Sequence, residues 1–326
     1  MAVPIWFNSL ACLGALYVAA VCCRLLISYL ALCLHRPKDL CRSYGSWAIV
    51  TGPTSGLGRS MALELARRGL NLVLLDLDAA RLRETSDAIR SRHTVKTKAV
   101  VFDLSLVATP QGEEAMRRLW EAIEGLDVGV LVNNAAVNTP GAVYLHEADI
   151  ERLVRMIRVN LWALTEVTAA VLPGMLARGR GAVVNVGSGS TVAVPSFPLY
   201  TVYSSTKRYV AQLTRSLYVE YKSKGIDFQY QVPFYVHTRM LSSAVKASSK
   251  VRPWFVATAD EYARTAARWI GNGPLCVPGA AQKLQLCLTG FLPEWVHDQY
   301  RIRLHLQHRA ILRKLRESST AGGKVR

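Results

Sequence analysis

Between residues 46 and 232, short apolar runs alternate strictly with longer amphipathic stretches, and this alternation restricts the fold more than any other feature of the chain. Apolar runs bounded by turn residues are typical of buried strands, whereas the stretches between them have helical periodicity. Strands that alternate with helices form a parallel sheet that is covered on both faces. We therefore expect an α/β fold with a doubly wound parallel sheet, with strands at 47–50, 72–75, 98–102, 128–132, 182–186 and 226–232 and helices at 56–68, 79–92, 112–124, 150–176 and 203–224.

The first predicted strand runs into the glycine-rich sequence TGPTSGLG at residues 51–58, and a predicted helix follows at once. Glycines allow a tight turn and a close approach of the backbone to a pyrophosphate, and a helix N-terminus attracts an anion. In doubly wound sheets the ligand binds beyond the carboxyl ends of the strands, which is where this turn lies. The turn therefore predicts a dinucleotide site, with Thr51, Gly52, Ser55, Gly56, Leu57 and Gly58 as candidate residues.

Tyr203 and Lys207 are four residues apart on a predicted helix and so share one of its faces. A phenol has a pKa near 10, and moving it close to neutrality takes about 4 kcal/mol of preferential stabilisation of the anion, part of which a neighbouring ammonium supplies. Such a tyrosine can exchange a proton with a carbonyl or alcohol oxygen. Tyr218 and Lys222 repeat the spacing, but they lie far into the helix and lack the serine-containing segment 187–190 that precedes Tyr203, so we interpret them as a solvated helix face.

These motifs in combination resemble the short-chain dehydrogenase/reductase superfamily, whose T-G-x-x-x-G-x-G and Y-x-x-x-K patterns match residues 51–58 and 203–207. The resemblance runs from about residue 46 to 240. The segments "GLDVGVLVNN", "AVVNVGSGS" and "PLYTVYSSTK" look more narrowly like the membrane-bound beta-ketoacyl-CoA reductases of very-long-chain fatty acid elongation, especially the plant type, a branch related to a 17-beta-hydroxysteroid dehydrogenase group. This implies a Rossmann domain that reduces 3-oxoacyl-CoA to 3-hydroxyacyl-CoA together with other elongase subunits. Two alternatives remain open, namely a hydroxysteroid or other lipid alcohol dehydrogenase and a non-catalytic dinucleotide-binding scaffold of an elongase complex.

The resemblance also implies the roles of the catalytic residues. Tyr203 would protonate the 3-oxo oxygen, while Lys207 would lower the pKa of Tyr203 and hold the nicotinamide ribose. Ser188 would bind the substrate oxygen, with Ser190 as the alternative, because Ser188 lies fifteen residues before Tyr203, a little more than the family's usual interval. Asn160 would complete the set by holding a water molecule linked to the lysine.

The cofactor residues that the resemblance implies are Asp103 for the adenine, Asn133 as a brace of the sheet, and Thr238 for the nicotinamide amide. The choice between NADP(H) and NAD(H) depends on Asp76, which closes the second predicted strand. An acid at this place accepts hydrogen bonds from a ribose 2′-hydroxyl and repels a 2′-phosphate. Asp76 therefore predicts NADH, whereas the resemblance implies NADPH and Arg59 could offset part of the repulsion, so both cofactors stay open.

The first 45 residues predict a membrane anchor. Residues 4–34 hold a single charged side chain, Arg24, and Ile5 to Cys23 has the length of a bilayer span. A cleaved signal peptide is the alternative, but a basic n-region is missing. Basic residues follow the span and place the body on the cytosolic side, and the cysteine-free stretch 46–275 fits a reducing compartment. With the resemblance, this indicates the endoplasmic reticulum membrane.

The basic charge is concentrated near the ends of the chain. The formal net charge is +17, yet we find no zinc-ligand spacing or nucleic-acid-binding motif, so we expect neither a nucleic-acid partner nor a metal site. Residues 274–296 are apolar and fit either a lipid-facing or acyl-chain-holding segment or a buried extension. Residues 300–316 mix apolar and basic side chains and fit an interfacial helix on anionic lipid or a solvated tail. We therefore divide the chain into an anchor and linker (1–45), a Rossmann domain (46–273) and a membrane-associated extension (274–326).

Overall fold

The structure is a computed structural model, and it describes residues 5–34, 36–139, 141–237, 256–290 and 292–322. The chain divides into two compact units, Met1–Pro37 and Lys38–Arg326. The first unit contains helix α1 (Ile5–Leu34), in which Trp6–Cys23 is long and apolar enough to cross a membrane. A second stretch of this kind, Ile150–Arg178, is half buried within the other unit and covers its sheet.

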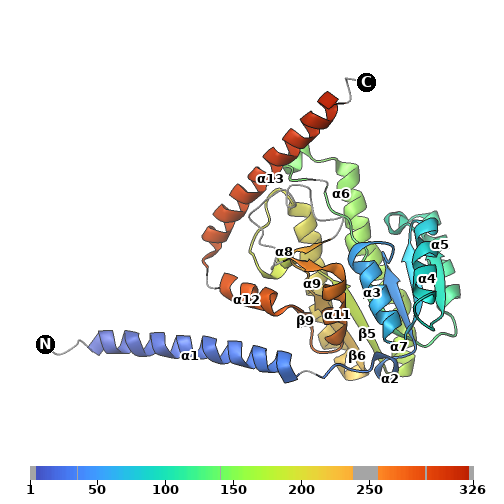
Figure 1. The fold of residues 1–326 in the computed structure, drawn as a ribbon, viewed down its shortest axis with the longest axis horizontal. Coiled ribbons are helices and arrows are strands. Elements are labelled where there is room, and N and C mark those ends of the chain that lie inside the picture. Colours follow the sequence, from blue (N-terminus) through green and yellow to red (C-terminus); the bar gives the residue numbers. More distant parts are fainter. Residues whose placement is uncertain (1–4, 35, 140, 238–255, 291, 323–326) are drawn as a thin grey trace. The chain divides into compact units, whose positions relative to one another are not determined.

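A seven-stranded sheet forms the centre of the second unit, and all of its strand pairs are parallel (Figure 1). The strand order is β3-β2-β1-β4-β5-β6-β9, so the direction of winding reverses between β1 and β4. At such a reversal the loops at the carboxyl ends of the strands separate and leave a crevice. The strands are β1 (Trp47–Thr51), β2 (Asn71–Asp76), β3 (Thr97–Val101), β4 (Val128–Asn133), β5 (Gly181–Val186), β6 (Ile226–Gln231) and β9 (Leu275–Cys276).

Helices cover both faces of this sheet, which confirms the doubly wound fold. One face packs against α3 (Gly56–Arg67), α4 (Ala79–Arg90) and α11 (Ala259–Arg268). The other packs against α5 (Pro110–Ile123), α7 (Leu164–Arg178) and α9 (Thr201–Tyr221). The residues of β1, β4 and β5 are buried throughout, because a strand between two helix layers has no solvent-facing side.

The long helix expected at 150–176 is interrupted. It consists of α6 (Ile150–Ile157), a π-helical segment (Arg158–Ala163) and α7. A π-helical turn inside a helix shifts the side chains that follow it and often occurs at functional sites. Asn160 lies in this segment. Shorter helical elements are η1 (Leu104–Leu106), η2 (Leu145–Glu147), α8 (Gly189–Val192) and η4 (Lys222–Lys224).

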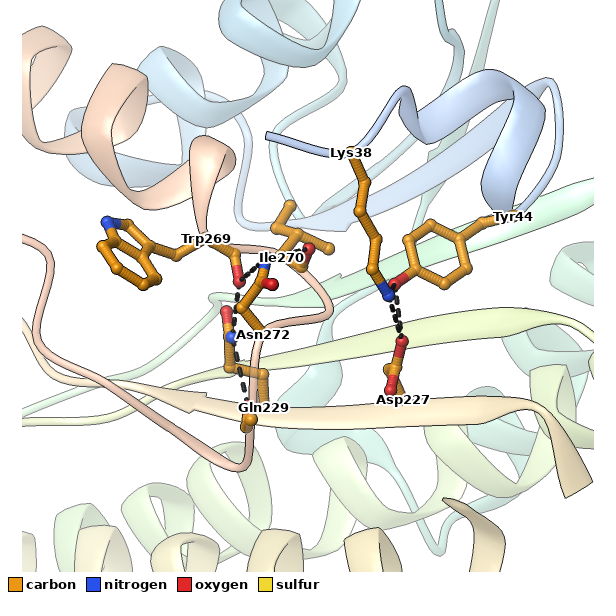
Figure 2. A network of polar contacts seen from close by, with 8 residues as sticks. Lys38, Tyr44, Asp227, Gln229, Trp269, Ile270 and Asn272 are labelled. Atoms are coloured by element: carbon orange, nitrogen blue, oxygen red, sulfur yellow. Dashed lines mark hydrogen bonds and ion pairs between the residues drawn. The ribbon is translucent and has the colours of Figure 1, made fainter. Parts of the chain in front are cut away.

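The segment before β1 packs on the sheet, so the compact unit begins at Lys38, ahead of the boundary expected at residue 46. It contains α2 (Leu40–Ser43), and both Leu40 and Tyr44 are buried. Figure 2 shows Lys38 Nζ and Tyr44 Oη converging on Asp227 Oδ2 of β6, at 3.0 and 2.6 Å. In the same view Gln229, two residues farther along β6, donates to the carbonyl of Trp269 (2.7 Å).

The C-terminal region joins the same unit. Strand β9 pairs with the edge of β6, and α12 (Ala280–Thr289) and α13 (Glu294–Gly322) follow. A two-stranded parallel pair is formed by β7 (Val236–His237) and β8 (Ala257–Thr258). Residues 238–255 between them are outside the described residues.

Candidate active site

A cavity of about 500 Å³ lies at the carboxyl ends of the strands. It is lined by the glycine-rich turn, by the ends of β2 and β5, by the loop after β4 and by the start of α9. Two histidines of α13, His305 and His308, also line it. One cavity therefore brings much of the expected dinucleotide site together with three of the four expected catalytic residues, Ser188, Tyr203 and Lys207.

The glycine-rich turn has the backbone that a pyrophosphate needs. Gly52 and Gly56 have φ angles of +66° and +54°, in the left-handed region where a side chain is strained. A Cβ on Gly58 would lie 2.0 Å from the carbonyl oxygen of Gly52. Ser55 is the N-cap of α3, and its side chain makes no capping hydrogen bond within the described part of the chain. The first turn of α3 thus begins at the cavity wall with uncapped N–H groups, and the residues present fit a dinucleotide phosphate.

Thr51 holds this turn against the loop that follows β4. Its Oγ1 accepts hydrogen bonds from the backbone N–H groups of Asn134 and Ala135, both at 3.0 Å. The side chain of Asn134 donates in return to the carbonyls of Thr51 and Gly52, both at 3.1 Å. Asn134 lines the cavity, and the sequence reasoning missed it. The sequence feature that could have predicted Asn134 is its position directly after the last residue of β4.

Asn133 is buried inside the sheet, where its Nδ2 donates to Thr168 Oγ1 and to Asn185 Oδ1, both at 2.9 Å. It links β4 to α7 and β5, which is the bracing position that was expected. Asp103 lines the cavity after β3, and its Oδ1 accepts from the backbone N–H and the hydroxyl of Ser105. Thr238 lies outside the described residues.

Asp76 lines the cavity and is held in place by two hydrogen bonds. Its Oδ2 accepts from Thr54 Oγ1 at 2.7 Å, and its Oδ1 accepts from the backbone N–H of Leu77 at 2.8 Å. Arg59 does not line the cavity among the described residues, and its guanidinium lies 3.6 Å from Glu84 on α4. The charge that was expected to offset Asp76 is therefore directed at another carboxylate.

Ser188, Tyr203 and Lys207 meet on one wall of the cavity. Ser188 hydrogen-bonds to the hydroxyl of Tyr203, and Ser190 Oγ donates to Ser188 Oγ at 2.9 Å. The Nζ of Lys207 donates to the carbonyl of Val186 at 2.9 Å. Of the two candidate serines, Ser188 is on the cavity wall and bonded to Tyr203, while Ser190 lies behind it.

Burial controls the protonation of this set. Desolvation raises the pKa of Tyr203, and the hydrogen bond from Ser188 acts in the opposite direction. Desolvation lowers the pKa of Lys207 to about 8. The Lys207 ammonium is directed at the Val186 carbonyl in this structure, and its lowering of the Tyr203 pKa stays a prediction. In the protein without a bound cofactor, Tyr203 is therefore a protonated phenol that can donate its proton.

Asn160 is buried behind the cavity wall. Its Oδ1 accepts from the backbone N–H of Val137 (2.8 Å), and its Nδ2 donates to the Val137 carbonyl and to Thr206 Oγ1, both at 3.0 Å. It therefore connects the loop after β4 to the residue that precedes Lys207. This arrangement makes Asn160 a positioning residue in the described structure.

Tyr230 on β6 is a second residue that the sequence reasoning missed. Its hydroxyl accepts from the backbone N–H of Ser188 (3.1 Å), donates to the carbonyl of Lys207 (3.2 Å) and shares a hydrogen bond with Thr191 Oγ1 (2.8 Å). Only glycine fits at position 187, because a Cβ there would lie 2.0 Å from the Tyr230 ring. One buried hydroxyl thus fixes the serine loop relative to the helix that contains Tyr203 and Lys207.

A phosphate cradle beside a buried tyrosine, serine and lysine defines the class as oxidoreductases that use a nicotinamide dinucleotide. Residues 46–249 match the short chain dehydrogenase family, and the chain belongs to this family.

The relatives of this chain include reductases and an inactive protein. A very-long-chain 3-oxoacyl-CoA reductase-like protein of Arabidopsis thaliana is 43% identical over 279 residues, which cover 85% of this chain and 86% of that protein. The inactive hydroxysteroid dehydrogenase-like protein 1 of Homo sapiens is 32% identical, covering 89% and 88%. Among solved structures, a short-chain dehydrogenase from Sphingobium yanoikuyae in complex with NADPH has a TM-score of 0.61 and 27% identity, covering 76% of this chain and 96% of that one.

Proposed function

We propose that this protein is a very-long-chain 3-oxoacyl-CoA reductase, which reduces a 3-oxoacyl-CoA to a 3-hydroxyacyl-CoA in fatty acid elongation. The observation that carries the proposal is the hydrogen-bonded pair of Ser188 and Tyr203 beside the dinucleotide cradle, in a chain that is 43% identical to a reductase-like protein of this kind. The cavity continues from the cradle past this pair to α13, and we place the substrate in the part next to α13.

The residues divide the work of the reduction. The nicotinamide cofactor supplies a hydride to carbon 3 when it is bound. Ser188 holds the 3-oxo oxygen by a hydrogen bond, and Tyr203 gives that oxygen its proton as negative charge develops on it. Lys207 binds the cofactor ribose, and Asn160 and Tyr230 keep the two ends of the catalytic wall in register.

The test is turnover of long-chain 3-oxoacyl-CoA by the purified full chain. We expect Tyr203→Phe to lose nearly all activity, because phenylalanine keeps the ring and removes the proton donor. Tyr218→Phe is the matched control, since Tyr218 has the same spacing to Lys222, lies outside the cavity and packs under the Lys222 ammonium. If wild-type protein reduces ketosteroids and leaves 3-oxoacyl-CoA untouched, the substrate assignment is wrong.

A non-catalytic scaffold is the second candidate, because a relative of similar length is named inactive. Ala136 and Phe234, which both line the cavity, also stand where the family pattern usually has glycine. The scaffold hypothesis predicts that Tyr203→Phe still restores elongation in a host that lacks its reductase. The enzyme hypothesis predicts that it does not.

We further propose that the enzyme prefers NADH. The support is Asp76, whose carboxylate is fixed at the cavity wall by Thr54 and Leu77, together with the pairing of Arg59 with Glu84. A ribose 2′-hydroxyl can donate to such a carboxylate, whereas a 2′-phosphate is repelled by it. The ratio of NADPH to NADH turnover is the measurement.

We also propose that α1 anchors the enzyme in the endoplasmic reticulum membrane with the catalytic unit in the cytosol, beside other elongase subunits. Its apolar length and the basic residues Arg36, Lys38 and Arg42 that follow it support this placement. Residues 274–326 remain a predicted contact with membrane lipid, and no nucleic-acid partner is proposed. Protease protection in sealed microsomes tests the orientation, and a protected catalytic unit would refute it.

A further inference from the structure

The C-terminal helix α13 supplies part of the cavity wall, although it lies outside residues 46–249 that match the family. Ile302 on α13 packs against the cluster of Ala142, Leu199 and Tyr200. Two polar contacts hold the same helix, namely the Ser196–Asp298 hydrogen bond and the Glu147–Arg309 ion pair. These contacts fix the face of α13 that carries His305 and His308.

His305 is held in one tautomer. Its Nδ1 lies 2.6 Å from the carbonyl oxygen of Pro198, and because a carbonyl only accepts, Nδ1 carries the hydrogen. Burial, aided by the nearby charge of Arg301, lowers the pKa of His305 to about 4, so the ring is neutral at physiological pH. The ring is also packed edge-on against Phe197 and Tyr200, with centroid distances of 4.5 and 5.1 Å. Its Nε2 is therefore a fixed acceptor on a side chain that lines the cavity.

His308, one helical turn farther on, is the complementary group. It is 6% exposed, its ring centroid is 5.8 Å from that of His305, and burial lowers its pKa as well. Its ring has no hydrogen-bond partner in the part of the chain that the structure describes. Because His308 also lines the cavity, its ring nitrogens are available to a polar ligand group there.

We propose that His305 and His308 form a binding site for a secondary amide of the substrate, the group found in the pantetheine arm of a CoA thioester. The Nε2 of His305 accepts a hydrogen bond from the amide N–H, and the N–H of the neutral His308 ring donates to the amide carbonyl. The acyl chain and the thioester contain no N–H donor, so the pair recognises the CoA side of the substrate. This inference rests on the proposed acyl-CoA reductase function.

The test compares two substrates with the same 3-oxoacyl chain, the CoA thioester and a simple S-alkyl thioester without amides. For wild-type enzyme we expect kcat/KM to be about tenfold or more lower with the amide-free thioester, which corresponds to the loss of one to two hydrogen bonds. His305→Asn keeps a donor for the Pro198 carbonyl and removes Nε2. We expect it to raise KM for the CoA thioester about tenfold, with kcat preserved, and to leave the amide-free substrate unaffected.

His297→Phe is the control variant, because His297 is a buried histidine of the same helix that bonds to Thr289 and does not line the described cavity. If His305→Asn lowers kcat/KM equally for both substrates, the histidines only shape the wall and the proposal is wrong. It is equally wrong if the wild-type enzyme treats the two thioesters alike, a result that needs no variant to fold.

A binding measurement separates this proposal from the proposed function. Free CoA and adenosine 3′,5′-bisphosphate, which lacks the pantetheine arm, are titrated into wild-type enzyme and into His305→Asn. We expect only the binding of CoA to weaken in the variant, by about tenfold. An equal effect on both ligands, or no effect on CoA, contradicts the amide site. Absence of 3-oxoacyl-CoA turnover contradicts only the proposed reductase function.

Discussion

Replacing Asp76 with asparagine removes one charge from the cavity wall while leaving its hydrogen bonds possible. The asparagine Oδ1 can still accept from the N–H of Leu77, and its Nδ2 can donate to Thr54 Oγ1, which lies 2.7 Å from the carboxylate in the structure. The substitution therefore tests charge with little change in geometry. We expect it to shift the cofactor preference from NADH toward NADPH.

The magnitude follows from Coulomb's law. A carboxylate and a phosphate dianion about 5 Å apart at an effective dielectric constant of about 40 repel each other by ~3 kcal/mol, and salt reduces this toward ~1 kcal/mol. Removing the repulsion improves kcat/KM for NADPH about 10- to 100-fold. NADH loses a charge-assisted hydrogen bond from its ribose, which lowers its kcat/KM about fivefold.

The assay is the ratio of kcat/KM for NADPH to that for NADH, at about 0.05 M and about 0.5 M salt. Asp87→Asn is the control, because Asp87 is an exposed carboxylate on α4 that pairs with Arg90 and does not line the described cavity. The reasoning is refuted if the ratio in Asp76→Asn equals that of the wild type, or if the repulsion is insensitive to salt.

Three further substitutions test the cradle and the catalytic wall. Gly58→Ala places a methyl carbon 2.0 Å from the Gly52 carbonyl oxygen, so we expect the free energy of unfolding to fall by ~1–3 kcal/mol. We also expect the Kd for the cofactor to rise, and an unchanged Kd would contradict this. The pKa of Lys207 is about 8 in the folded protein and 10.5 ordinarily. Between pH 8 and pH 10.5 the lysine is therefore protonated in the unfolded chain and mostly neutral in the folded one, so the free energy of unfolding rises with pH by up to ~1.4 kcal/mol per pH unit. We expect urea denaturation to show this rise in the wild type and not in Lys207→Met, and equal slopes would contradict it. Tyr230→Phe removes the hydroxyl that accepts from the Ser188 N–H and donates to the Lys207 carbonyl, so we expect kcat to fall about tenfold and the free energy of unfolding to fall by about 1–3 kcal/mol. An unchanged kcat would show that the serine loop is held by other contacts.

Local chemistry explains why much of the fold could be predicted. The strand expected at 72–75 is found at Asn71–Asp76, and the helix expected at 56–68 is found at Gly56–Arg67. A strand that is buried on both faces requires a run of apolar residues, and a helix that packs on a sheet requires apolar residues at helical spacing. Both patterns can therefore be recognised from residues that are close together in the sequence. The π-helical interruption around Asn160 was not predicted, because its sequence continues the helical periodicity.

Parts of the site depend on contacts between residues far apart in the chain. The hydroxyl of Tyr230 reaches Ser188 across forty-two positions, and His305 reaches the Pro198 carbonyl across more than a hundred. No local pattern encodes such a pairing. The amphipathic pattern of the C-terminal helix predicts a lipid surface, which stays a prediction, but it did not reveal that the buried histidines and Ile302 of this helix pack on the catalytic unit.

The sequence by itself determined the alternating sheet, the phosphate cradle and the pair of Tyr203 and Lys207, because periodicity, glycine geometry and helical spacing act over a few residues. Only the tertiary structure decided that Arg59 is directed at Glu84 instead of the cavity, that burial raises the pKa of Tyr203, and that α13 supplies two histidines to the wall. These outcomes depend on desolvation and on which distant surfaces meet, and both are properties of the packed chain.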